Sequence, residues 1–107
     1  MDQVLLVMCN VPDAAVARHI AEQILQKKCA ACVNVMPEML SFYNWNGRQA
    51  TSTEIALLIK STQTRYAELQ ALIQRLHPYE VPEIIAIPVA DGLPAYLQWV
   101  IKETGSE

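Results

Sequence analysis

The stretch Tyr43-Asn44-Trp45-Asn46-Gly47-Arg48, which reads YNWNGR, decides the fold of this chain. An Asn-Gly pair adopts positive φ at little cost and is the strongest short signal for a tight β-hairpin. The segments on its two sides, Ala31–Tyr43 and Ser52–Lys60, are strand-like in composition. We therefore expect these two segments to pair as antiparallel strands.

The residues before this hairpin predict a strand followed by a helix. Val4–Cys9 is a short apolar run with β-branched residues, typical of a strand that is buried on both faces. Pro12 and Asp13 then open a helix. Its apolar residues recur with helical spacing along one stripe, which comprises Val16, Ile20 and Ile24.

The residues after the hairpin predict a helix, a strand and a closing helix. The first of these helices follows Ser61 and Thr62, whose hydroxyls can cap its N-terminus. It is expected to end before Pro78, because proline disfavours helical geometry in the preceding residue. Ile84–Val89 is the last strand, and Pro94 begins the closing helix.

The resulting order, β-α-β-β-α-β plus a C-terminal helix, predicts an α+β fold of the ferredoxin-like, split β-α-β type. Its antiparallel sheet carries the two main helices on one face, and residues 1–107 are expected to form one domain. The strands within Val4–Met8, Ile55–Ile59 and Ile84–Val89 are apolar on both faces. Because helices cover only one face, we expect further copies of the chain to bury the other.

Composition excludes several classes of partner. The net charge is −3, and the eight Lys and Arg residues are scattered, which argues against nucleic acid. No apolar run approaches the roughly 20 residues of a membrane span. The start Met1–Val4 has no basic segment of the kind that begins a secretion signal, so we expect a cytoplasmic protein with three reduced cysteines.

Cys9 and His77 are expected to meet at one end of the sheet. Cys9 ends the first strand, and His77 lies between the second helix and the last strand. These two strands are neighbours in this fold, about 4.8 Å apart, so a thiolate and an imidazole could approach each other there. That pair of donors suits copper or zinc better than magnesium or calcium. The alternatives are a packed strand-end thiol and a helix-capping histidine.

The other two cysteines, Cys29 and Cys32, have CxxC spacing but are not expected to form a redox or zinc site. The pair ends a helix, so no helix N-terminus lowers the pKa of its thiols. A structural zinc ion would also need two more ligands nearby. We interpret both residues as buried thiols at the end of the sheet remote from Cys9.

The segment His77-Pro78-Tyr79-Glu80-Val81-Pro82-Glu83 is the most unusual stretch of the chain. Its two prolines favour an extended form and remove two backbone donors. Tyr79, Glu80 and Glu83 would project from it as a rigid ledge, with Trp45 of the hairpin at the same end. A ledge of this kind serves either a binding site or a subunit contact.

Several motifs together resemble the CutA divalent-cation-tolerance family. They are, in chain order, Asn10–Asp13, Lys28–Asn34, Tyr43–Gly47, Leu58–Lys60 and His77–Glu83. The resemblance runs from about Val4 to Trp99, and the HPYEVPE stretch is its most specific part. It implies a ferredoxin-like homotrimer that is linked to tolerance of copper and other divalent cations.

The resemblance also implies metal ligands. Copper-binding members use a cysteine at the end of the first strand and two adjacent histidines before a Pro-Tyr pair. Cys9 and His77 match two of these three positions, whereas Leu76 stands at the third and cannot coordinate a metal. Any site here would complete its ligands with water or a neighbouring chain.

The leading functional hypothesis is a trimeric, non-enzymatic copper- or divalent-cation-binding protein. The alternative is a trimer that senses a small molecule, as the nitrogen-regulatory PII proteins do, in an inter-subunit cleft lined by Trp45, Lys60, Tyr79 and Glu83. The tight hairpin argues against it, since a PII-like function predicts a long mobile loop. Two other functions are not supported. A hydrolase of the acylphosphatase type would need an Arg after the first strand, and the loop there, residues 10–13, has none. RNA binding would need stacking aromatics on the central strands, which lack them.

Overall fold

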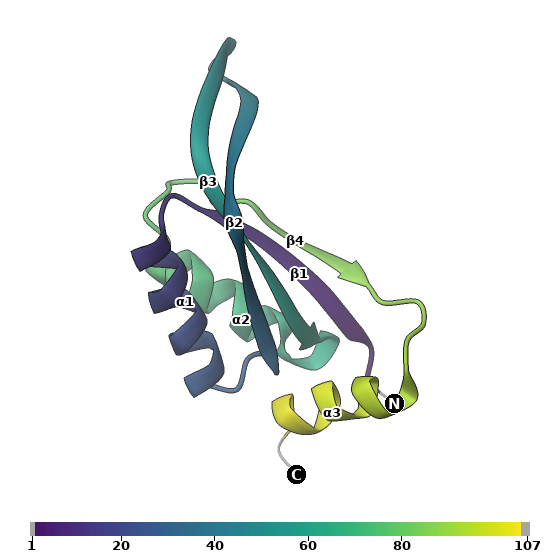
Figure 1. The fold of residues 1–107 in the computed structure, drawn as a ribbon. Coiled ribbons are helices and arrows are strands. Elements are labelled where there is room, and N and C mark those ends of the chain that lie inside the picture. The colour runs from purple at the N-terminus through teal and green to yellow at the C-terminus, as the bar shows by residue number, and fades with distance from the viewer. Residues whose placement is uncertain (1, 106–107) are drawn as a thin grey trace.

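The computed structural model describes residues 2–105. Within these residues the elements follow the expected order (Figure 1). They are β1 (Val4–Val11), α1 (Ala14–Gln26), β2 (Cys32–Trp45), β3 (Arg48–Thr62), α2 (Gln63–Leu76), β4 (Ile84–Pro88) and α3 (Pro94–Thr104). None of the helices in this range is long and apolar enough to cross a bilayer.

The four strands form one antiparallel sheet in the order β2-β3-β1-β4. Helices α1 and α2 lie together on one face of this sheet (Figure 1). The predicted α+β, ferredoxin-like fold is therefore confirmed. The predicted neighbours β1 and β4 are paired, with Cys9 opposite Ile84 at one end and Leu5 opposite Pro88 at the other.

The hairpin of β2 and β3 is longer than predicted and projects beyond the helices (Figure 1). Asn46 and Gly47 form its turn with φ values of 52° and 77°, as the Asn-Gly signal predicts. Pairing continues up to Trp45 and Arg48, directly beside this turn. A register shift separates Val35 from Glu38, where Pro37 cannot donate to the ladder.

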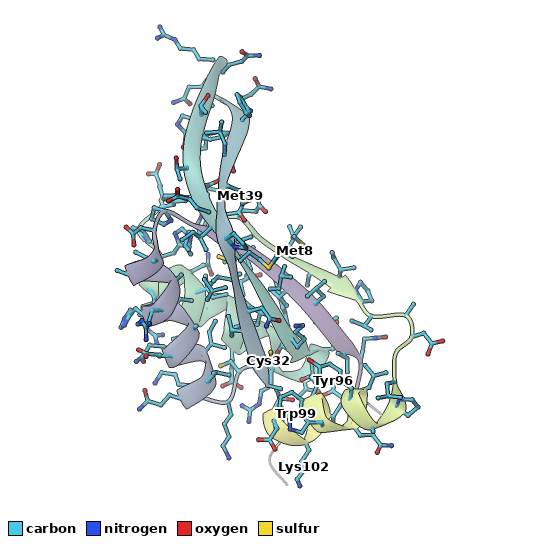
Figure 2. The ribbon with its side chains drawn as sticks, in the orientation of Figure 1. Met8, Cys32, Met39, Tyr96, Trp99 and Lys102 are labelled. Carbon is cyan, nitrogen blue, oxygen red and sulfur yellow. The ribbon has the colours of Figure 1, made fainter. Side chains whose placement is uncertain are left out.

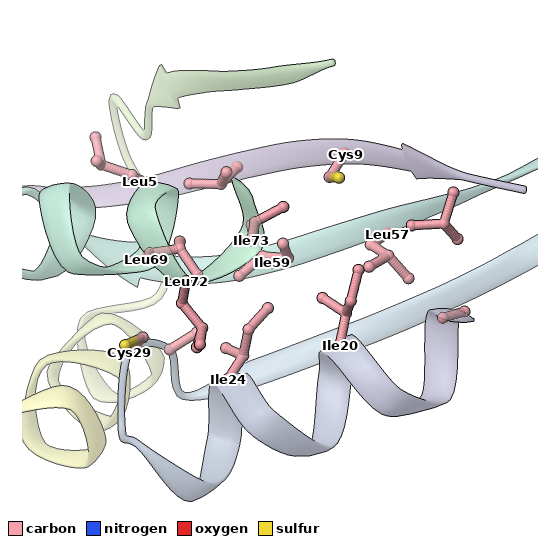
Figure 3. Close-up of a cluster of buried hydrophobic side chains, with 14 of the residues drawn as sticks. Leu5, Cys9, Ile20, Ile24, Cys29, Leu57, Ile59, Leu69, Leu72 and Ile73 are labelled. Atoms are coloured by element: carbon pink, nitrogen blue, oxygen red, sulfur yellow. The ribbon is translucent and has the colours of Figure 1, made fainter. Parts of the chain in front are cut away.

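The hydrophobic core lies between the sheet and helices α1 and α2 (Figure 3). Alternate residues of each strand face it, because side chains point to opposite faces along a strand. Val7 and Cys9 of β1 are fully buried there, as are Leu57 and Ile59 of β3. Ile20 and Ile24 of α1 meet Leu69 and Ile73 of α2 in the same cluster, as the predicted stripe required.

The two main helices start differently from one another. The Asp13 carboxylate accepts a hydrogen bond from the Val16 N–H at 2.9 Å and caps α1. Thr62 occupies the corresponding position of α2, but its hydroxyl makes no cap bond and is buried without a partner among the described residues. The Ser61 hydroxyl instead donates to the Cys29 carbonyl at 2.5 Å. The predicted hydroxyl cap of α2 is therefore wrong.

The other face of the sheet, which we call the open face, is only partly covered. Helix α3 packs against β3 and β1. Figure 2 shows Cys32, Tyr96 and Trp99 at this end of the sheet. Farther along, Ile85 and Ile87 of β4 pair with Met8 and Leu6 on the same face and are 48% and 44% exposed.

Candidate functional site

The two predicted metal ligands meet at one backbone carbonyl. The Cys9 thiol lies 3.8 Å from the carbonyl oxygen of Asn10, and His77 Nε2 lies 2.7 Å from the same oxygen. Cys9 is brought there by β1, and His77 by the end of α2, where its N–H donates to the Ile73 carbonyl at 2.8 Å. The prediction that the two donors meet at this end of the sheet agrees with the structure.

Each of the two donors carries a proton in this arrangement. Burial raises the pKa of the Cys9 thiol from 9.0 to about 12, and the negative charges of Glu83 and Glu54 add to the shift. His77 Nδ1 accepts a hydrogen bond from the Tyr79 N–H at 3.1 Å. The ring proton is therefore assigned to Nε2, which donates to the Asn10 carbonyl.

The pair is not a preformed metal centre. Nowhere in residues 2–105 do three or more His, Cys, Asp or Glu side chains converge in a way that could hold an ion. Leu76 packs against the hydrophobic core and contributes no donor. A metal could bind at Cys9 and His77 only if the thiol lost its proton and the ring proton left Nε2, since both now point at the Asn10 carbonyl.

Next to this pair, a cleft of about 570 Å³ opens along the hairpin. Its walls combine aromatic rings with carboxylates. It is lined by Asn10, Ser41, Phe42, Tyr43, Trp45, Glu54, Tyr79, Glu80, Val81 and Glu83. The cleft draws on β1, the β2–β3 hairpin and the segment 77–83, which are far apart in the sequence.

Two hydrogen bonds tie the segment 77–83 to the sheet across this cleft. The Tyr79 hydroxyl donates to Glu54 Oε2 at 3.0 Å, and Asn10 Nδ2 donates to Glu83 Oε1 at 3.3 Å. Burial raises the pKa of Tyr79 to about 12, and the hydrogen bond to Glu54 contributes to the same shift. The extended segment 77–83, predicted from its two prolines, is thus hydrogen-bonded to the sheet through Tyr79 and Glu83.

The remaining residues predicted for the cleft are divided by the structure. Trp45, Tyr79 and Glu83 line it together. Lys60 does not, because it pairs with Leu6 and Cys32 toward the other end of the sheet and donates to the Asn34 side chain. Cys29 and Cys32 also lie at that remote end, as predicted; Cys29 is buried as expected, but Cys32 is only half-buried.

Glu54, the buried carboxylate of the cleft, was not predicted from the sequence. It lies in β3 opposite Met39, among polar residues typical of a solvent-facing stretch of the hairpin. Only 7% of its surface is exposed, and its hydroxyl donor, Tyr79, is contributed by a distant segment. A carboxylate pairing with a tyrosine of the HPYEVPE stretch is a contact that no local pattern reveals.

The fold and this end of the sheet define a class of protein: a small ferredoxin-like α+β protein with a thiol, an imidazole and an acidic aromatic cleft together. The family model of the CutA1 divalent ion tolerance protein matches residues 5–103. The divalent-cation tolerance protein CutA of Thermus thermophilus is 41% identical over 105 residues, which cover 98% of this chain and 100% of that protein. The CutA homolog of Xenopus laevis is 42% identical, but the chain spans only 59% of its length.

Solved structures agree with the sequence matches. The divalent cation tolerance protein Cut A1 of Thermus thermophilus has a TM-score of 0.92 at 40% identity, covering 98% of this chain and 100% of that one. CutA1 of Oryza sativa has a TM-score of 0.93 at 33% identity, with 98% and 96% covered. The chain therefore belongs to the CutA1 divalent ion tolerance family.

Proposed function

We propose that this protein is a homotrimeric, non-enzymatic protein that binds copper, and other divalent cations more weakly, in metal-ion tolerance. Membership of the divalent ion tolerance family supports the general role. The observation that carries the copper site is the meeting of the Cys9 thiol and the His77 imidazole at the Asn10 carbonyl. A thiolate and an imidazole are donors that copper prefers.

Binding at this point releases the thiol proton of Cys9 and moves the ring proton of His77. The Cys9 thiol must ionise, which its burial and its raised pKa oppose, so affinity is expected to rise with pH. Coordination through His77 Nε2 moves the ring proton to Nδ1. The hydrogen bond from the Tyr79 N–H to Nδ1 then has to open, so copper binding is coupled to the segment 77–83.

Copper titration of the purified protein tests the site directly. Cys9→Ala and His77→Gln each remove a metal ligand and are expected to weaken copper binding by more than 10–100-fold. That is the loss typically seen when a residue that only hydrogen-bonds to a ligand is removed. Cys32→Ala and His19→Gln remove the same residue types from the remote end of the sheet and from the exposed surface of α1. Equal affinity in all four variants would refute the assignment.

The homotrimer is supported by the apolar surface that one chain leaves uncovered. On the open face Ile85 and Ile87 are about half exposed, and on the hairpin Phe42 is 75% exposed. Both β2 and β4 are edge strands with unpaired backbone groups on one side within the described chain. Exposed apolar side chains on the two free edge strands of the sheet are typical of surfaces that associate with other copies.

Ile87→Glu is expected to dissociate the trimer. The substitution places a charge on the open face, where a subunit interface would have to bury it. Light scattering should then report a mass near that of the 12.0 kDa chain instead of three times that value. Leu25→Glu, on the half-exposed surface of α1, should leave the mass unchanged. A wild-type protein that is monomeric would disprove the trimer itself.

The small-molecule alternative is favoured by one observation, the cleft of about 570 Å³ beside Cys9 and His77. A volume of this size is within the range of sites for small organic ligands. Three of the four residues predicted for an inter-subunit cleft line this cleft within one chain, although Lys60 does not.

A further inference from the structure

Lys60 places a positive charge on the open face of the sheet. Side chains alternate between the two faces along β3, and Ile59 faces the core, so Lys60 faces away from it. It lies between Leu6 and Cys32 of the neighbouring strands and donates to the Asn34 side chain. A second copy of the chain that covers the open face therefore covers this ammonium group as well.

No carboxylate of the described chain is paired with Lys60. The ion pairs found within residues 2–105 join Arg18 to Glu22 and Arg65 to Glu68. Lys60 is already half-buried in one chain, and burying a charge is costly unless an opposite charge and hydrogen bonds compensate it. The homotrimer proposed above therefore needs a carboxylate from the second copy at this place.

Glu54 is the carboxylate on the same face of β3. It lies six residues before Lys60, so the alternation of side chains turns it to the open face too. The Tyr79 hydroxyl donates to its Oε2, but a carboxylate can accept several hydrogen bonds. The cleft that Glu54 lines also contains Glu80 and Glu83 and no Lys or Arg. The negative end of the open face thus lacks a cation, as the positive end lacks a carboxylate.

The two charges cannot meet within one chain. Six residues of extended strand span about 20 Å, which is far beyond the reach of an ion pair. Figure 2 shows their strand partners on β2, Cys32 and Met39, well apart along the sheet. A ring of three copies, in contrast, joins two different surfaces of each chain head to tail. One end of the open face can then meet the other end of the next copy.

We propose that Lys60 of each copy forms an ion pair with Glu54 of the next copy, so that the cleft is completed by a side chain from a second chain. This inference rests on the proposed homotrimer and names the contact that closes its ring. The methylene stem of Lys60 has an apolar surface to pack on in the Trp45 ring of the same cleft.

Arg48 is the other cation on this side of β3, and it serves as the comparison. It lies beside the turn of the hairpin and is exposed, so water can hydrate its charge. Its guanidinium has no need of a carboxylate from a second copy. Lys60, among apolar residues of the open face, has that need.

A double-mutant cycle on subunit exchange tests the pair. Labelled and unlabelled trimers are mixed, and mass spectrometry under native conditions follows the rate at which they exchange chains. Lys60→Met and Glu54→Gln are each expected to speed exchange at least tenfold, because each leaves one buried charge without its partner. The double variant should exchange much more slowly than the product of the two effects predicts. Residues about 20 Å apart in one chain do not couple in this way, so coupling means contact between chains.

Two further variants keep the test decisive. Arg48→Met removes a cation from the same strand and should leave the exchange rate unchanged, alone or with Glu54→Gln. Glu54→Asp keeps the charge but shortens the side chain, and it replaces Glu54→Gln in the cycle if that variant fails to fold. Lys60→Arg keeps the positive charge and should exchange within severalfold of the wild type.

Two results would overturn the ion pair and leave the homotrimer standing. One is a double variant whose exchange rate equals the product of the two single effects. The other is coupling of Glu54→Gln to Arg48→Met instead of Lys60→Met, which would assign the contact to the tip of the hairpin. A wild-type protein with the mass of one chain would disprove the homotrimer itself and the ion pair with it.

Discussion

Replacing Ile59 by alanine is expected to lower the free energy of unfolding by about 4 kcal/mol, since buried Ile-to-Ala changes typically cost 2–5 kcal/mol. Ile59 is fully buried in β3, one of the two central strands, and pairs with Val7 on one side and Val33 on the other. Figure 3 shows it facing the cluster between the sheet and the two helices. Its neighbours lie on β1, on β2 and on the two helices, and they cannot all move into the space that the substitution leaves.

Leu25→Ala is the matched control for this experiment. Leu25 lies on α1 with 44% of its surface exposed, so the same loss of methyl groups should cost less than about 1 kcal/mol. Denaturant unfolding should be compared at one protein concentration, because association would contribute to the measured stability. Equal losses in both variants would mean that the core is not where the structure places it.

Alkaline pH is expected to destabilise the protein through Cys9. The pKa of its thiol is about 12 in the folded chain and 9.0 in the unfolded chain, so the folded state holds the proton more tightly. Stability from this group is therefore complete below pH 9 and is lost as the pH rises from 9 toward 12. By about pH 11 the loss should reach roughly 2–3 kcal/mol, as a pKa shift is worth about 1.4 kcal/mol per unit.

Denaturant unfolding of the wild type and Cys9→Ala, at intervals between about pH 8 and pH 11, isolates this contribution. The raised pKa values of Cys29, Tyr79 and Tyr96 affect both proteins alike. At pH 8 the variant should be slightly less stable because it leaves a small void. The difference should shrink and then reverse as the pH rises. Parallel pH profiles would show that Cys9 does not ionise with an unusual pKa.

Much of the fold is predictable because its signals are local. Asn46 and Gly47 readily adopt the positive φ values that the hairpin turn needs. Pro78 ends α2, because it disfavours helical geometry in the residue before it. Two features were not predictable: the residues at which the hairpin strands end, and the lack of a cap bond from the Thr62 hydroxyl. Both depend on tertiary packing, which decides whether a strand continues and whether a hydroxyl can reach a backbone N–H.

In the candidate site, the sequence predicted only those contacts that follow from the directions of the strands and helices. Cys9 and His77 meet because each lies at an end of an element whose direction the fold fixes. Lys60 was placed in the cleft from sequence, although strand direction puts it near Cys32. Glu54 was missed because its burial depends on the Tyr79 side chain, and a contact between segments so far apart has no local signature.

The pairing of the sheet has a consequence for the order in which the chain folds. The strands of the β2–β3 hairpin adjoin in sequence, and closing their turn requires almost no loop entropy. In contrast, the pairing of Leu5 with Pro88 joins distant parts of the chain and closes a loop that contains most of it. We expect the hairpin to form early and the β1–β4 ladder to form late. The Cys9–His77 junction and the cleft depend on that ladder and on the segment before β4, so they are completed in the last steps of folding.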